Sequence, residues 1–237
     1  MAKFLSLFRR HPRRNKKTTR RPTDDTPESQ HAFSSDLLQQ EEEINILEPD
    51  PELVRLLSLN PWDAVDRERY DDAAVQRLIE TNPQAACVKH EFQQRRRGRR
   101  GTLQYPLFRA AALGASLTVV TLLGDACPAS FHETGVPADG KTALHSACAY
   151  QASLEVIVYL LTQNPDAAGC RNKHGYTPLQ NACEYGASSP EVILVLQKAC
   201  PQALGWKNKL GQTPYQTAER KGADAAILSI LTLPAGC

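Results

Sequence analysis

Histidine and cysteine are the residues that first suggest chemistry in this sequence, as metal ligands or as a nucleophile with its base. The chain contains six His and seven Cys. None of the cysteines forms a Cys-x-x-Cys pair, and no Ser, His and acid fall in a recognisable catalytic motif. A Gly-rich phosphate loop is also absent from the sequence. We therefore predict no catalytic, cofactor-binding or metal-binding residues and no cofactor, and we expect the chain not to be an enzyme.

The acidic residues likewise indicate no catalytic site. Asp71 and Asp72 are adjacent, and Glu41 to Glu43 form a run. Two neighbouring acids at the start of an apolar periodic stretch are typical of a helix N-terminus, and a run of Glu is typical of a solvated surface. We do not interpret either group as a pair of catalytic carboxylates.

Arginine and lysine form two dense clusters that could bind anions. One spans residues 9–21, and the other is a possible anion or nucleic-acid contact formed by Arg95, Arg96, Arg97, Arg99 and Arg100. Such clusters can contact phosphates, an acidic protein or the acidic part of the same chain. The first cluster is also compatible with a nuclear import signal, an organelle transit peptide, a weak membrane-surface contact or a plain solvated tail.

The charge distribution separates an N-terminal arm from the rest of the chain. Residues 1–23 carry nine Lys or Arg and no acid, whereas residues 24–60 carry ten acids and one Arg. Like-charged blocks bury too little apolar surface to offset chain entropy. We predict a disordered arm at 1–50, basic over 1–23 and acidic over 24–52, and a folded part that begins near residue 50.

A repeated segment organises the folded part. The stretch from Gly140 to Cys148 (GKTALHSAC) recurs from Gly175 (GYTPLQNAC) and again from Gly211 (GQTPYQTA), at steps of 35 and 36 residues. A weaker copy begins at Tyr105. Cys148 and Cys183 occupy the same small-residue position, so packing explains these cysteines. A fixed period of this size predicts stacked structural units.

The residue types of the repeat encode a turn followed by two helices. The Gly permits a tight turn, the Thr two positions later caps the next helix, and Pro at the first helical position is preset to the helical φ. A second periodic stretch follows in each unit, and Pro83, Pro128, Pro165 and Pro201 then stop it. Gln151 replaces the Gly that would end the first helix, which predicts local strain at that position.

These features resemble the ankyrin repeat, whose turn reads Thr-Pro-Leu-His and whose units are a turn and two antiparallel helices. Tetratricopeptide repeats have a similar period, but they lack the Gly-x-Thr-Pro-Leu turn. The resemblance implies an all-α, ankyrin-type helix-turn-helix solenoid with a disordered N-terminal arm. It places about four repeats at 101–237, the first and last degenerate, with His145, Asn172 and Asn208 bonding turn backbone.

A helical N-terminal cap and an Arg-rich loop are predicted for 51–100. Pro61–Val65 and Ala73–Ile79 are similar to a capping pair of helices. The spacing of 18 residues from Pro83 to Gly101, against ten in later units, predicts an enlarged finger that contains the arginine cluster.

The resemblance implies a protein-binding scaffold or adaptor whose partner meets the turn tips and the exposed edge of each first helix, on the concave face. Transferred unit by unit, the partner-binding positions are Lys141, Tyr150, Lys173, His174, Tyr176, Glu184, Tyr185, Lys209, Leu210, Arg220 and Lys221. The alternative is a nuclear regulator that contacts nucleic acid through 9–21 and 95–100. Nothing in the sequence identifies the partner protein.

No apolar run is long enough for a membrane span, so we expect no stable membrane insertion. We also expect a monomer with free thiols in the cytoplasm or nucleus, with an organelle transit peptide as the alternative.

Overall fold

The computed structural model describes residues 48–92, 102–134, 139–185 and 189–232. The chain divides into a unit at 1–44 and a unit at 45–237, and all described residues lie in the second. The predicted arm up to residue 47 and the cluster 95–100 are outside the described residues. Within them the chain forms eleven α-helices and two short strands.

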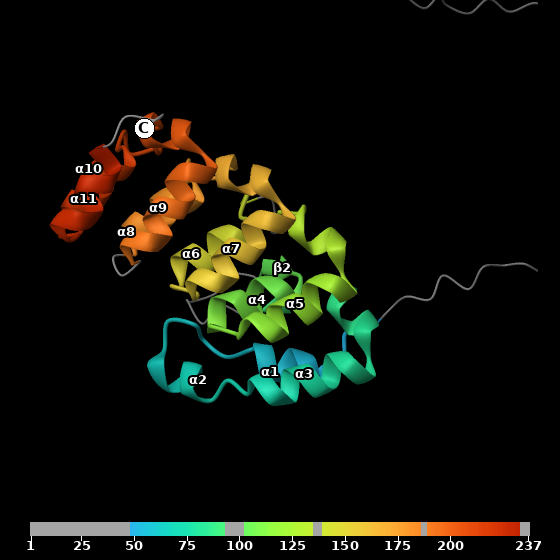
Figure 1. Cartoon of the computed structure of the whole chain (residues 1–237). Helices are drawn as coiled ribbons and strands as arrows, with labels where there is room; N and C mark the ends of the chain where they lie inside the picture. The colour runs from blue at the N-terminus through green and yellow to red at the C-terminus, as the bar shows by residue number, and fades with distance from the viewer. Residues whose placement is uncertain (1–47, 93–101, 135–138, 186–188, 233–237) are drawn as a thin grey trace, which may run out of the picture. The chain divides into compact units, whose positions relative to one another are not determined.

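Eight of the helices form four antiparallel pairs that follow one another along the chain, as Figure 1 shows. The first helix of each pair packs against the first helix of the next, and the second helices form a parallel row. The pairs are α4 (Pro106–Leu113) with α5 (Leu117–Ala126), α6 (Ala143–Ala149) with α7 (Leu154–Gln163), α8 (Pro178–Glu184) with α9 (Pro190–Ala199), and α10 (Pro214–Arg220) with α11 (Ala225–Thr232). This confirms the predicted helical solenoid.

The first helices of the last three pairs begin at the predicted threonines. Thr142, Thr177 and Thr213 each accept a hydrogen bond from the backbone N–H three residues later, and the side chain at that later position accepts one from the threonine N–H. Both groups satisfy amides that the first helical turn leaves without a partner. The second helices of the first three pairs start in a simpler way, with Ser116, Ser153 and Ser189 as N-caps.

The predicted proline stops are present, and each also begins a short segment of its own. Pro128, Pro165 and Pro201 follow the last residue of α5, α7 and α9 by two positions, and each opens a 3-10 turn. Proline lacks the N–H that a continuing α-helix needs, but its fixed φ suits the first position of a new turn. These turns redirect the chain toward the next repeat.

The core lies between the two rows of helices. Ile157 and Leu160 of α7 and Ile193 and Leu196 of α9 are all buried and form the apolar face of the second helices. The inner row buries several small residues among larger ones, including Ala147, Cys148, Ala182 and Cys183. Small side chains allow neighbouring helices to approach closely, so the cysteines have a packing role.

The N-terminal cap differs from the predicted pair of helices. Its two long elements are α1 (Pro51–Leu57), which packs against α4, and α3 (Asp72–Thr81), which packs against α5. Pro61–Val65 was expected to supply one of the two helices, but only a short helix, α2 (Ala64–Glu68), forms there. Both helices have an aspartate N-cap, Asp50 and Asp63, so the difference lies in burial: α1 buries three leucines, whereas α2 has no buried residue.

A two-stranded hairpin stands at the base of the predicted finger. Strand β1 (His90–Phe92) pairs antiparallel with β2 (Thr102–Gln104), and His90 is opposite Gln104. The all-α fold therefore carries one small β addition within the described residues. The arginine cluster lies between these two strands in sequence, outside the described ranges.

Candidate functional site

A groove of about 1280 Å³ lies between the cap and the repeats. One wall is formed by α1 and the segment from Ser58 to Trp62, together with Asp66 and Arg69 of the α2 region. The floor and opposite wall come from the inner helices and the turn tips of the repeats. We call this feature the cap–repeat groove.

Eight of the eleven predicted partner-binding residues line the cap–repeat groove. They are Lys141, Tyr150, His174, Tyr176, Glu184, Tyr185, Lys209 and Leu210. Lys173, Arg220 and Lys221 do not line it. The repeat therefore brings together side chains that are up to 69 residues apart in sequence.

Three aromatic rings from the cap and two repeats meet in the groove. The ring of Trp62 lies 4.5 Å from that of Tyr150 and 4.9 Å from that of Tyr185, measured between centroids. Trp62 remains 57% exposed and Tyr185 41% exposed. The two tyrosines were predicted for the surface from the repeat alone. Trp62 was not, because its position depends on the course of the cap.

A buried arginine holds the cap segment that carries Trp62. Arg109 of α4 donates from Nε to the carbonyl oxygen of Leu57 at 3.0 Å and from Nη2 to that of Leu59 at 2.5 Å. Burial lowers the pKa of this guanidinium. The sequence signal for this contact is an arginine among the small and apolar residues of α4, where a charged side chain needs polar partners.

The turn tips form a row of positive charge beside the rings. Asp139 O accepts a hydrogen bond from Lys173 N, and His174 O accepts one from Lys209 N, so each tip is tied to the next. Burial and the positive charges of Lys173, Lys141 and Lys209 together lower the pKa of His174. We call Lys141, Lys173, His174 and Lys209 the basic ridge.

The predicted turn contacts of Asn172 and Asn208 are confirmed. Asn172 Oδ1 accepts from the N–H groups of His174 and Tyr176, and Asn208 Oδ1 accepts from those of Leu210 and Gln212. His145 also bonds turn backbone, because its Nδ1 accepts from Thr142 N and its Nε2 donates to Tyr176 O. These contacts fix the shape of the tips that carry the basic ridge.

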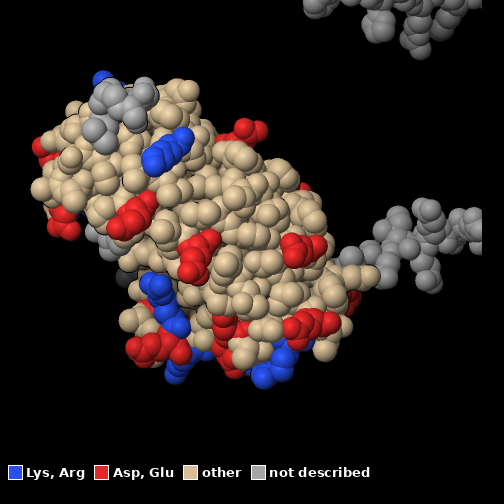
Figure 2. Space-filling model, viewed as in Figure 1, with Lys and Arg blue, Asp and Glu red and all other residues tan. Residues whose placement is uncertain are grey.

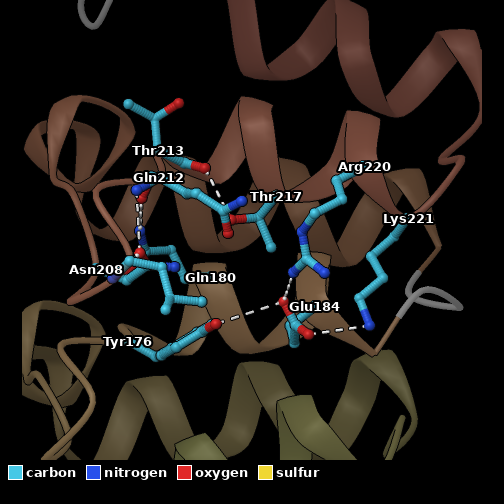
Figure 3. A network of polar contacts seen from close by, with 10 residues as sticks. Tyr176, Gln180, Glu184, Asn208, Gln212, Thr213, Thr217, Arg220 and Lys221 are labelled. Atoms are coloured by element: carbon cyan, nitrogen blue, oxygen red, sulfur yellow. Dashed lines mark hydrogen bonds and ion pairs between the residues drawn. The ribbon is translucent and has the colours of Figure 1, made fainter.

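Four of the predicted residues form a network that joins the third and fourth pairs, shown in Figure 3. Glu184 accepts from Arg220 and from the hydroxyl of Tyr176, and its other carboxylate oxygen lies 2.9 Å from Lys221 Nζ. These contacts give Arg220 and Lys221 a structural role between repeats. They also neutralise an acid that lines the groove.

The face seen in Figure 2 contrasts with the basic ridge. Over the repeats, charged side chains stand singly on a largely uncharged surface, and blue and red residues gather mainly over the cap. Within the described ranges no three His, Cys, Asp or Glu residues are placed to hold a metal, and no helix there is long and apolar enough to cross a membrane. The arginine cluster of the nucleic-acid alternative is not part of the described surface.

Paired helices, capped turns and a groove lined by turn tips together define a helical-repeat protein. Residues 107–202 match the family model for ankyrin repeats, in three copies, so this part of the chain is an ankyrin-repeat array. No curated protein matches the chain. The fourth pair, α10 and α11, lies beyond the matched residues but begins with the same Thr and Gln caps. Ankyrin repeats are protein–protein interaction modules and are typically not enzymes.

Proposed function

We propose that the chain is a non-enzymatic adaptor that binds another protein in the cap–repeat groove. The observation that carries the proposal is the exposure of large apolar side chains there. Trp62, Tyr185 and Leu210 are 57%, 41% and 70% exposed, and all three line the groove. Exposed apolar patches bordered by polar groups are typical of interaction sites, and Trp and Tyr are enriched among residues that dominate binding energy.

The dimensions of the groove favour a macromolecule over a metabolite. Small-molecule pockets usually measure about 300 to 1,000 Å³ and enclose their ligand. The groove here has about 1280 Å³, and its lining comes from the cap and from the turn tips that precede three helix pairs. An extended segment or a surface loop of a partner can contact all of these elements at once.

Comparison of co-purified proteins tests the proposal. The tagged full-length chain, a Tyr185→Ala/Leu210→Glu variant and a Val158→Glu control are expressed in the same cells. Val158 is exposed on α7 and does not line the groove, so it controls for surface charge. We expect quantitative mass spectrometry to recover one set of proteins with the wild type and the control and to lose it with the groove variant. Equal recovery with all three would mean that partners bind elsewhere.

A further inference from the structure

The ring cluster of Trp62, Tyr150 and Tyr185 is built from two different parts of the fold. The tyrosines belong to the repeats, whereas Trp62 comes from the cap segment that crosses toward them. A tryptophan that leaves more than half of its surface exposed while packed on two other rings retains a large apolar area in water. Covering that area with a partner side chain is favourable.

The segment that presents Trp62 is fixed on both sides before any partner arrives. Arg109 holds the carbonyls of Leu57 and Leu59. Asn60 donates its N–H to Asp66 Oδ2 at 3.0 Å and accepts from Trp62 N at 3.2 Å. A ring held in this way loses little freedom on binding, which increases the affinity that its contacts provide.

The basic ridge has little internal compensation for its charge. Lys141 Nζ lies 3.8 Å from Asp139, whereas Lys173 and Lys209 form no ion pair with any residue that the structure describes. Main-chain hydrogen bonds tie the three tips together, and the charges of Lys141, Lys173 and Lys209 all act on His174, so these cations surround one histidine. Carboxylates of a partner placed along the ridge would supply the missing counter-charge.

We propose, on the basis of the function proposed above, that the groove binds a partner segment with two chemical parts. An aromatic or large aliphatic side chain packs on the ring cluster, and acidic residues next to it run along the basic ridge. The cap is thus part of the binding site, because it supplies one of the three rings.

The groove favours a protein segment over a nucleic acid. Asp66 and Glu91 also line it, on the cap side of the groove. Acids on this side repel a continuous phosphate backbone, which carries a charge at every nucleotide. A peptide can instead place its acids only where the ridge is basic.

Selection of short random peptides displayed on phage against the full chain tests this inference. Enriched peptides are synthesised with a fluorophore and titrated with the wild type and with the groove variants Trp62→Ala, Trp62→Phe, Leu210→Glu and Lys173→Glu/Lys209→Glu. Val158→Ala and Lys198→Glu are the matched controls, since both residues are exposed and neither lines the groove. A fluorescent single-stranded DNA oligonucleotide is titrated in parallel.

We expect the enriched peptides to combine acidic residues with an aromatic or large aliphatic one. Trp62→Ala and the double charge reversal should each weaken binding about tenfold or more, Trp62→Phe should restore most of the affinity, and both controls should stay within about twofold of the wild type. Raising the salt concentration should weaken wild-type binding more than binding by the double variant.

The contrary outcomes separate this inference from the proposed function. The inference would be overturned by peptides that bind Leu210→Glu more weakly but contain no acidic residues, or by peptides whose affinity is the same for Trp62→Ala as for the wild type. Either result would leave the groove as a protein-binding site. Peptides whose affinity is unchanged by every groove substitution would overturn both the inference and the proposed function. An absence of enriched peptides, or tighter binding of the oligonucleotide, would overturn the two-part peptide as the ligand.

Discussion

At the scale of single residues, His145 shows how the turn depends on a neutral side chain. Its imidazole is buried between two repeats, with Nδ1 accepting from Thr142 N and Nε2 donating to Tyr176 O. This pattern requires the tautomer with a proton on Nε2 only. Burial, more than any other cause, lowers the pKa of His145 to about 4.

The position of His145 makes stability depend on pH. Unfolded chains take up a proton on this histidine near pH 6.5, whereas the folded chain resists it down to about pH 4. The free energy of unfolding should therefore fall by about 3 kcal/mol as the pH decreases through this window. In the next repeat Gln180 makes the corresponding bonds, accepting from Thr177 N and donating to Gln212 O.

His145→Gln should accordingly keep the turn and remove this part of the pH dependence. Urea titrations between pH 7 and pH 4 measure the slope, and His132→Gln, at an exposed position, is the control that should retain it. A slope in His145→Gln equal to that of the wild type would contradict the assigned role.

Gln151 is the residue at which the repeat is least well suited to its backbone. It has φ +60°, and Gly114 and Gly222 occupy the equivalent positions at +86° and +72°. A left-handed backbone conformation costs a residue with a side chain about 1 to 2 kcal/mol. Glycine avoids this cost but loses more conformational entropy on folding, so the net gain in stability is smaller. Gln151→Gly should raise the free energy of unfolding by about 0.5 to 1 kcal/mol in urea titrations. A loss of stability would mean that the contact of Gln151 with Tyr185 O outweighs the strain.

At the scale of elements, equivalent glycines of two turns face different surroundings. Gly140 and Gly211 have φ +70° and +78°. A Cβ on Gly140 would lie 2.8 Å from the carbonyl oxygen of Arg171, in the next turn, whereas a Cβ on Gly211 would meet no atom of the described residues within 4 Å. The difference arises because the turn of Gly140 packs against a further turn, whereas the turn of Gly211 is the last one in the part of the chain that the structure describes.

Alanine at either position adopts the left-handed backbone at a cost in free energy. Gly140→Ala in addition forces two turns apart. We expect Gly211→Ala to lower the free energy of unfolding by about 1 kcal/mol and Gly140→Ala by about 2 kcal/mol or more. Thermal and urea unfolding of the two variants measure the difference. Equal losses would argue against direct contact between successive tips.

The elements also show what the sequence could and could not predict. The turns were predictable because Thr142, Thr177 and Thr213 act on backbone three residues away, so a local pattern specifies them. The cap was not, because Arg109 binds the carbonyls of Leu57 and Leu59 from about 50 residues away in sequence. Asp50 followed by Pro51 is the local sign that a helix begins there.

In the candidate site, too, some residues could be predicted from local sequence and others could not. The tyrosines and tip residues follow from the repeat spacing, because equivalent positions of stacked units share one face. Trp62 joins them through the cap, which departs from the repeat pattern. Trp62, from the irregular cap segment, therefore completes a surface that the repeats specify only in part.

At the scale of the described unit, the cap is joined to the repeats through buried polar contacts as well as apolar packing. Stacked repeats are stabilised by their neighbours, so an end unit with a weakened interface unfolds first. Arg109→Met removes the donors to the Leu57 and Leu59 carbonyls and should lower cap stability by about 2 kcal/mol.

Tryptophan fluorescence distinguishes the cap from the repeats in this variant. The chain has two tryptophans, so a Trp206→Phe background leaves Trp62 as the reporter. In Arg109→Met the Trp62 signal should change at lower urea than the helical circular dichroism, whereas the background protein should show transitions closer together. Coincident transitions in Arg109→Met would contradict a separately weakened cap.

Site-specific photo-crosslinking tests the central claim, that the cap–repeat groove binds a partner protein. A photoreactive amino acid is placed at Leu210, in the groove, or at Val158, on α7 outside it, in the otherwise unchanged full chain. Irradiation of cells should give a discrete covalent adduct from position 210 and none from position 158. The same adduct from position 158, or from both positions in equal yield, would contradict the claim.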